Sequence, residues 1–200
     1  MINLLEGKEV QLPRFNFITG KKEWYDEPVR LGENQPVLVE GLHALNPKLT
    51  YFVPGYQQMR IYLSALTQIN INNHNRISTS DTRLLRRMVR DVQYRGHSPE
   101  DTLSIWKSVR RGEEENIFSF QNRADRVFNS ALIYELPVLK KMTRPMLERI
   151  KKGNPLYPEA QRLIHFFEPF RELSDDFVPD NSILREFIGY KKTKFTEKGN

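Results

Sequence analysis

Two short apolar runs constrain the fold of this chain more than any other feature of its sequence. One lies in the segment 35–41 (QPVLVEG) and the other in 60–66 (RIYLSAL). Such continuous apolar runs are typical of strands that are buried on both faces of a parallel sheet. The intervening residues 42–58 are enough for a short helix and a crossover. We therefore predict two parallel strands within an α/β fold.

The residues before these runs predict an antiparallel hairpin. β-Branched and aromatic residues alternate there between clusters of Pro, Gly and Asn. The expected strands are 9–17 (EVQLPRFNF) and 24–31 (WYDEPVRL), and the segment 18–23 joins them. Gly20 lies in this connection and can adopt the positive φ that a tight turn requires.

The second half of the chain has a mainly helical pattern. Apolar residues spaced by one, three and four mark one face of a helix over 81–95, which Gly96 would end. A second helix is expected over 98–111, because a Ser-Pro pair begins it and Gly112 follows it. A short strand is expected at 124–132, and further helices are expected at 138–152, 158–172 and 182–189. The polar tail 191–200 is expected to fray.

The composition excludes several classes of protein. A hydrophobic fraction of 38% is too high for a mainly disordered chain. The absence of cysteine excludes disulfides, thiol nucleophiles and zinc sites built on thiolates. No apolar run is long enough to span a membrane and the first residues do not resemble a signal peptide, so we expect a cytoplasmic protein that has no membrane partner. The net charge of +6 favours an anionic ligand.

Glu40 is the first candidate for a functional residue. It follows the first apolar run and precedes Gly41. Ligands of open α/β sheets bind beyond the carboxyl ends of the strands, where a carboxylate can hold Mg²⁺ directly or through water. The same pattern also suits a residue that only caps the next helix. Spacing alone leaves both interpretations open.

Four arginines form the second candidate site. Arg83, Arg86, Arg87 and Arg90 recur at spacings of three and four, so we expect them to form one stripe opposite the apolar face of their helix. Guanidinium groups suit phosphate oxygens. A charged face that only solvates the helix is an equal alternative. Nucleic acid is a third interpretation, which we do not favour because the helix offers only Tyr94 as an interleaved aromatic residue.

Several segments occur in the order that is found in a known family. They are 13–17 (PRFNF), 37–45 (VLVEGLHAL) and 80–91 (SDTRLLRRMVRD), with Arg95-Gly96 beyond. Together they resemble the second half of the uridine kinase and phosphoribulokinase family. Within it, the segments 124–136 and 182–189 look most like the bacterial nucleoside (uridine) kinases. In those proteins the kinase domain follows domains related to the N-terminal part of threonyl-tRNA synthetase.

The resemblance implies roles for particular residues. Glu40 would be the acid near Mg²⁺, and the four arginines would belong to a lid helix that closes over the ATP phosphates. Family members bind the nucleoside partly through a Pro-x-Tyr-Asp-Phe-x-x-His-x-Arg hairpin. This sequence departs from that pattern, with Phe15 for Tyr, Asn16 for Asp, Gly20 for His and Lys22 for Arg. Phe15 can still stack on a base, and Asn16 can still accept and donate hydrogen bonds.

The resemblance also implies a fold and a reaction. The fold would be α/β, namely the C-terminal part of a P-loop kinase parallel sheet with an antiparallel hairpin, a lid helix and a helical C-terminal extension. Residues 1–135 would be the partial kinase domain, and 136–200 would be its helical extension. The reaction would transfer the γ-phosphate of ATP, in the presence of Mg²⁺, to a nucleoside 5′-hydroxyl.

The family places its phosphate loop and its catalytic Asp before the hairpin, where this chain has only residues 1–8. No G-x-x-x-x-G-K-[ST] motif occurs among its ten glycines. We therefore expect a fragment that is inactive alone, whose partner is the missing N-terminal part of the kinase domain, and whose exposed sheet edge favours a homo-oligomer. The alternative is a non-catalytic module that binds RNA or a partner through the Arg83–Arg90 stripe, and a third is a purely structural domain that binds neither.

Overall fold

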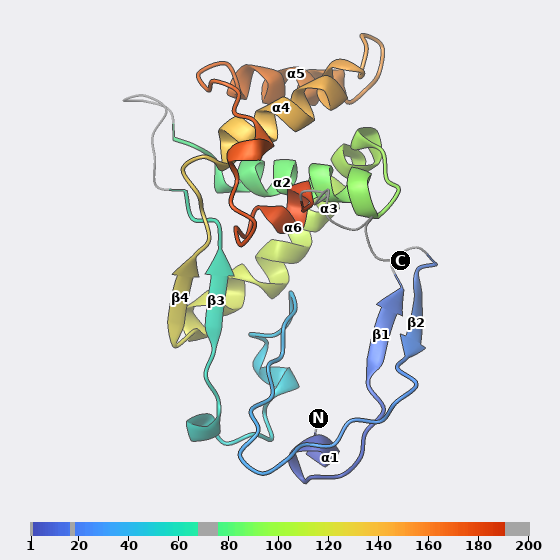
Figure 1. Ribbon diagram of the computed structural model, residues 1–200, viewed down its shortest axis with the longest axis vertical. Coiled ribbons are helices and arrows are strands. Elements are labelled where there is room, and N and C mark those ends of the chain that lie inside the picture. The colour runs from blue at the N-terminus through green and yellow to red at the C-terminus, as the bar shows by residue number, and fades with distance from the viewer. Residues whose placement is uncertain (1, 17–18, 68–75, 191–200) are drawn as a thin grey trace, which may run out of the picture. The chain divides into compact units, whose positions relative to one another are not determined.

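The computed structural model describes residues 2–16, 19–67 and 76–190 and divides them into two compact units (Figure 1). The first unit comprises Met1–Tyr62 and Gly112–Arg126, and the second comprises Leu63–Arg111 and Val127–Asn200. The structure is a mixed α/β arrangement with one antiparallel hairpin and one parallel pair of strands, so the predicted fold class is confirmed. The polar tail lies outside the described residues.

The first unit begins with α1 (Ile2–Leu5) and an antiparallel hairpin of β1 (Pro13–Asn16) and β2 (Lys21–Trp24). Gly20 forms the turn with φ 67°, and its N–H donates to the carbonyl of Asn16 at 2.8 Å. The hairpin is confirmed, but the predicted second strand is wrong in its bounds. β2 begins at Lys21, within the expected connection. Beyond Trp24 the pairing continues through the N–H of Tyr25, which donates to the carbonyl of Leu12 at 3.0 Å, and through an isolated bridge between Val29 and Val10.

The predicted strand at 35–41 is wrong. Residues 35–40 have no regular structure, and Leu38 is 93% exposed. A strand needs neighbours that satisfy its backbone N–H and C=O groups, and none of the described strands pairs with this segment. An apolar run by itself is therefore not enough to form a strand. Two short 3₁₀ helices, η1 (Pro47–Leu49) and η2 (Gly55–Gln57), follow it.

The parallel pair consists of β3 (Ile61–Ser64) and β4 (Arg126–Asn129). The carbonyl of Arg60 accepts from the N–H of Asp125 at 2.8 Å, and the carbonyl of Ser64 accepts from the N–H of Ser130 at 2.8 Å. The strands predicted at 60–66 and 124–132 are therefore confirmed, although they are shorter than expected. The partner of β3 is β4 and not the first apolar run.

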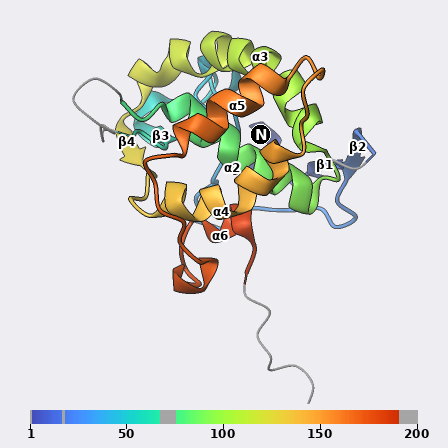
Figure 2. The same cartoon turned by 90° about the horizontal axis from the view of Figure 1, so that it is seen from above.

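The second unit is built around α2 (Thr79–Tyr94), which lies among α4 (Glu135–Glu148), α5 (Tyr157–Phe166) and α6 (Arg185–Ile188) in the view of Figure 2. The core residues of α2 are fully buried, and they are the apolar residues that the sequence predicts: Leu84, Leu85, Met88 and Val89. The Ser78 hydroxyl accepts from the N–H of Asp81 at 3.2 Å and caps this helix. The helix predicted at 81–95 is thus confirmed.

The other helices differ from the predictions mainly at their ends. α3 (Pro99–Asn116) runs through Gly112, because an interior glycine costs a helix only about 1 kcal/mol and does not break it. α5 ends six residues before the predicted end at 172, near Pro169, which has no N–H to continue the helix. The 3₁₀ helices η3 (Phe118–Arg123) and η4 (Asp175–Phe177) complete the elements. None of the helices in the described part of the chain is long and apolar enough to cross a bilayer.

Candidate functional site

One face of the hairpin in the first unit presents aromatic rings and a cation. Phe15 lies directly opposite Lys22 in the register, and Trp24 follows two residues later on the same face. The Lys22 ammonium lies 4.1 Å from the centroid of the Trp24 ring, which is a cation–π contact. Phe15 is 55% exposed and Trp24 is 50% exposed. The face is therefore accessible to a planar ligand.

The opposite face of the hairpin is a polar network that includes Asn16. The Asn16 amide donates to the Glu23 carboxylate at 2.9 Å, and the Arg14 guanidinium donates to the other oxygen at 3.0 Å. The Asn16 side-chain oxygen accepts from the N–H of Thr19 at 3.1 Å. The structure therefore brings Phe15 and Lys22 together and places Asn16 on the other face, where it stabilises the turn.

Glu40 lies in the same unit, but the strand that was expected to present it does not form. The residue is exposed and is followed by a turn at 41–45. Among the residues that the structure describes, no three His, Asp or Glu side chains gather closely enough to hold a metal ion. The placement of Glu40 at a strand end is thus wrong, while its role toward Mg²⁺ stays a prediction.

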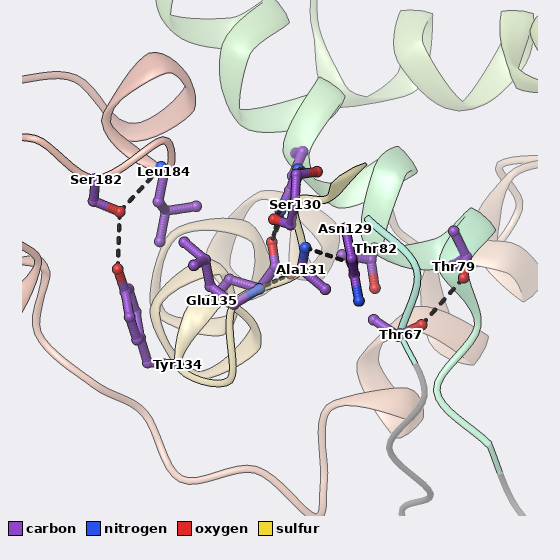
Figure 3. A network of polar contacts seen from close by, with 12 residues as sticks. Thr67, Thr79, Thr82, Asn129, Ser130, Ala131, Tyr134, Glu135, Ser182 and Leu184 are labelled. Carbon is purple, nitrogen blue, oxygen red and sulfur yellow. Dashed lines mark hydrogen bonds and ion pairs between the residues drawn. The ribbon is translucent and has the colours of Figure 1, made fainter. Parts of the chain in front are cut away.

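Arg86 in the second unit is buried, which corrects the prediction of a single exposed arginine stripe. Its Nε donates to the Glu135 carboxylate at 2.6 Å, and its Nη2 donates to the carbonyl of Ser130 at 2.8 Å. Figure 3 shows the positions of Ser130 and Glu135. Burial raises the pKa of Glu135, and the positive charge of Arg86 opposes that shift. Arg86 can leave the solvent because Glu135 supplies a buried counter-charge.

Arg87 is held by a buried carboxylate on its own helix. Its Nε donates to Asp91 at 3.0 Å, and Arg95 donates to the other oxygen of Asp91 at 3.0 Å. The Thr102 hydroxyl of α3 contacts the same carboxylate at 3.4 Å, and Asp91 is only 1% exposed. The Asp91 carboxylate therefore partly neutralises the positive charge in the second half of the stripe.

Arg90 contacts the C-terminal helix of the unit. Its Nη1 lies 3.4 Å from the Glu186 carboxylate, and its guanidinium lies 5.5 Å from the centre of the Phe187 ring. Burial lowers the pKa of Arg90, and the neighbouring Arg95 lowers it further. Arg83 lies one turn before Arg87 and is partly buried. The stripe is thus a mixture of buried, paired and partly exposed guanidinium groups, and this weakens the interpretation as a broad RNA-binding surface.

The comparison with protein families gives a match to the model of the Phosphoribulokinase / Uridine kinase family over residues 1–134. The chain belongs to this family. The family gives the chain a kinase-type function in general, and such kinases generally use ATP and Mg²⁺. A search of the curated proteins finds no match.

The family match covers the hairpin, Glu40, α2 and both parallel strands of this phosphoribulokinase/uridine kinase family member. It ends one residue before Glu135, so the partner of Arg86 lies outside it. Within the match, Asn129 joins the strands, because its amide oxygen accepts from the N–H of Leu66 at 2.9 Å and its amide nitrogen donates to the carbonyl of Leu66 at 2.9 Å. Asn129 therefore holds the end of β4 to the residues that follow β3.

The sequence alone did not identify four residues of this kinase-family chain that contact the candidate site residues: Trp24, Glu135, Glu186 and Phe187. The period of two along a strand could have indicated Trp24, because it lies two residues after Lys22. The other three come from elements far from α2 in the sequence. Periodicity within one helix cannot identify them.

Proposed function

We propose that the chain supplies the nucleoside-binding hairpin and the phosphate-binding lid helix of an ATP-dependent kinase that phosphorylates a nucleoside 5′-hydroxyl. The observation that carries this proposal is the hairpin face of Phe15, Lys22 and Trp24, which lies inside the region that matches the family. Two half-exposed aromatic rings beside a cation suit a planar base with electronegative edge atoms.

Four residues of the hairpin would contribute to nucleoside binding in different ways. Phe15 would stack on the base, and Lys22 would contact an oxygen on the base or sugar. Asn16 would act through the shape of the hairpin, since its amide is engaged with Glu23 and with the turn. Trp24 would flank the ligand and hold the Lys22 side chain through the cation–π contact.

The arginines of α2 would bind the phosphates of ATP, and they would do so unequally. Arg83, Arg87 and Arg90 keep part of their surface exposed, whereas Arg86 is engaged with Glu135 and Ser130. We assign Arg86 to anchoring the helix and the other three to stabilising negative charge on the transferring phosphoryl group. ATP would supply that phosphoryl group.

Glu40 fits a role toward Mg²⁺ by its chemistry. Proteins usually bind this ion through one or two carboxylates, together with substrate phosphates and water. A single exposed carboxylate satisfies that requirement if phosphates complete the set. The guanidinium groups of α2 are likewise suited to phosphate oxygens.

The sequence contains no phosphate-loop motif, so we propose that a further polypeptide segment supplies the phosphate cradle. The parallel pair supports such a partner, since strands of parallel sheets are normally paired and covered on both faces. Leu63 is 59% exposed, Val127 is 60% exposed and Phe128 is 56% exposed. A second copy of the chain is the alternative occupant, and a homo-oligomer remains part of this proposal.

Tryptophan fluorescence tests the hairpin directly, because the chain has only two tryptophans. In a Trp106→Phe background, Trp24 becomes the single fluorophore. We expect uridine or cytidine to quench its emission in a saturable manner, and Phe15→Ala to abolish that effect. The matched control is Trp24→Phe, in which Trp106 should not respond. Equal quenching with and without Phe15 would contradict the proposed stacking.

A kinase assay tests the need for the further segment. We expect the purified chain, incubated with MgATP and uridine or cytidine, to yield no nucleoside monophosphate. Phosphorylation that Glu40→Gln abolishes would show that the chain is complete for catalysis, and would refute this part of the proposal.

A further inference from the structure

α6 is fixed firmly against α2, although it is only one turn long. Arg185 is 1% exposed, and its guanidinium donates to four carbonyls, those of Asp175 at 3.0 Å, Val178 at 2.5 Å, Pro179 at 3.4 Å and Gly189 at 3.2 Å. These bonds link the buried guanidinium to the backbone on both sides of α6. Arg185 therefore fixes α6 relative to the segment that leads into it.

The segment before α6 is tied to the start of α4. The Tyr134 hydroxyl lies 2.9 Å from the Ser182 hydroxyl, and Ser182 also accepts from the N–H of Leu184 at 3.2 Å (Figure 3). Glu135, the counter-ion of Arg86, follows Tyr134 directly. The same element that orders α6 therefore also holds Arg86.

Phe187 of α6 lies against two of the lid arginines. Its ring centre is 5.2 Å from the Arg86 guanidinium carbon and 5.5 Å from that of Arg90. Arg86 and Arg90 are four residues apart on one helix, where like charges repel each other. The negative face of an aromatic ring attracts guanidinium groups at this range, so the ring offsets part of that repulsion.

Arg90 has few other supports. Its Nη1 reaches Glu186 at 3.4 Å, and Glu186 is largely exposed. Its Nε is buried and has no hydrogen-bond partner among the described residues. A buried donor without a partner is unfavourable. The contacts from α6 are thus the ones that hold the guanidinium in this position, with 28% of its side chain still accessible.

We propose that Phe187 is a positioning residue, whose ring fixes the Arg90 guanidinium in the orientation in which Arg90 binds phosphate. This inference rests on the proposed role of α2 as the phosphate-binding lid. Arg86, neutralised by Glu135, is the rigid support on the other side of the contact. Phe187 lies well outside the region that matches the family, so the support comes from the chain's own C-terminal part.

The test measures binding of inorganic tripolyphosphate to the full chain by calorimetry. Cation–π contacts of this kind correspond to changes of about 2-fold to 30-fold in an equilibrium constant. We expect Phe187→Leu to weaken binding by about 5-fold, within that range. Phe187→Trp, which keeps an aromatic face, should bind within about 2-fold of the wild type. In an Arg90→Ala background, Phe187→Leu should cause no further loss.

Phe166→Leu is the matched control for lost packing. Phe166 is a partly buried core aromatic on α5, and its ring contacts are with Phe167 and Phe170. We expect this variant to lower the free energy of unfolding to a similar degree and to leave tripolyphosphate affinity unchanged. A parallel loss of affinity in Phe166→Leu and Phe187→Leu would show a general packing effect and would overturn the inference.

A readout without ligand separates the inference from the proposed function. The Nε–Hε resonance of Arg90 should show a ring-current shift in the wild type and in Phe187→Trp, and it should lose that shift in Phe187→Leu. If Phe187→Leu binds tripolyphosphate as tightly as the wild type does, only the positioning role of Phe187 would be overturned. If the wild type shows the ring-current shift but does not bind tripolyphosphate, the phosphate-binding role of α2 would be refuted. The role of Phe187 in phosphate binding would then be refuted with it.

Discussion

Removal of the Glu135 carboxylate is the most informative perturbation of the second unit. The Glu135 side chain is 1% exposed and that of its partner Arg86 is 8% exposed, so water cannot replace the lost contacts. Glu135→Ala would leave the Arg86 Nε and the N–H of Leu132 without their acceptors. Breaking a buried ion pair from one side costs about 3–5 kcal/mol. We expect the lower end, about 3 kcal/mol, because the carbonyl of Ser130 still accepts from Arg86.

Urea unfolding followed by far-ultraviolet circular dichroism at pH 7 measures this loss. The control is Glu148→Ala on the same helix, where the pair of Glu148 with Arg144 is exposed to solvent and should contribute little to stability. The double variant Arg86→Met with Glu135→Leu should recover most of the stability, since no buried charge remains. A loss below about 1 kcal/mol for Glu135→Ala, or one equal to that of Glu148→Ala, would refute the reasoning.

Three further predictions concern the same unit. Because burial raises the pKa of Glu135 in the folded state, the part of the stability that comes from this pKa shift is fully present below the unfolded pKa and is lost as pH rises through the folded pKa. Glu135→Gln should remove this part of the pH dependence in urea unfolding. Arg162→Met should cost about 1–2 kcal/mol in the same assay, because it removes the two hydrogen bonds of 2.9 and 2.7 Å to the buried Asp81. Gly189→Ala should lower the melting temperature, because its φ is +85° and a Cβ there would lie 2.9 Å from the Tyr94 hydroxyl; a melting temperature equal to that of the wild type would contradict this.

The sequence predicts the helical unit better than the strands, for a physical reason. The face of α2 is encoded locally, since Leu84 and Met88 are neighbours on one helix whatever surrounds them. The run at 35–41 has the composition of a buried strand, but a strand forms only with a partner that the run itself does not specify. The same distinction explains why the pairing of β3 with β4 could not be read from either segment.

The same distinction between local and long-range contacts applies to the residues of the candidate site. The hairpin itself could be predicted, because Gly20 marks its turn, but the pairing of Phe15 with Lys22 was missed, because the expected connection extended to residue 23 and included Lys22. The burial of Arg86 could not be predicted, because the spacing of residues within α2 carries no information about the carboxylate of Glu135. Whether an arginine faces solvent or a buried counter-ion is a property of the assembled unit and not of the helix that carries it.

The pairing of β3 with β4 has a consequence for the order of folding events. The Arg60 N–H donates to the Asp125 carboxylate at 2.7 Å across a sequence separation of 65 residues. Closing a loop of that length costs conformational entropy before any contact compensates for it. α2 lies within that loop and can form from local contacts, which shortens the span that remains to be closed. The parallel strands should therefore join late, after α2 has brought their ends closer together.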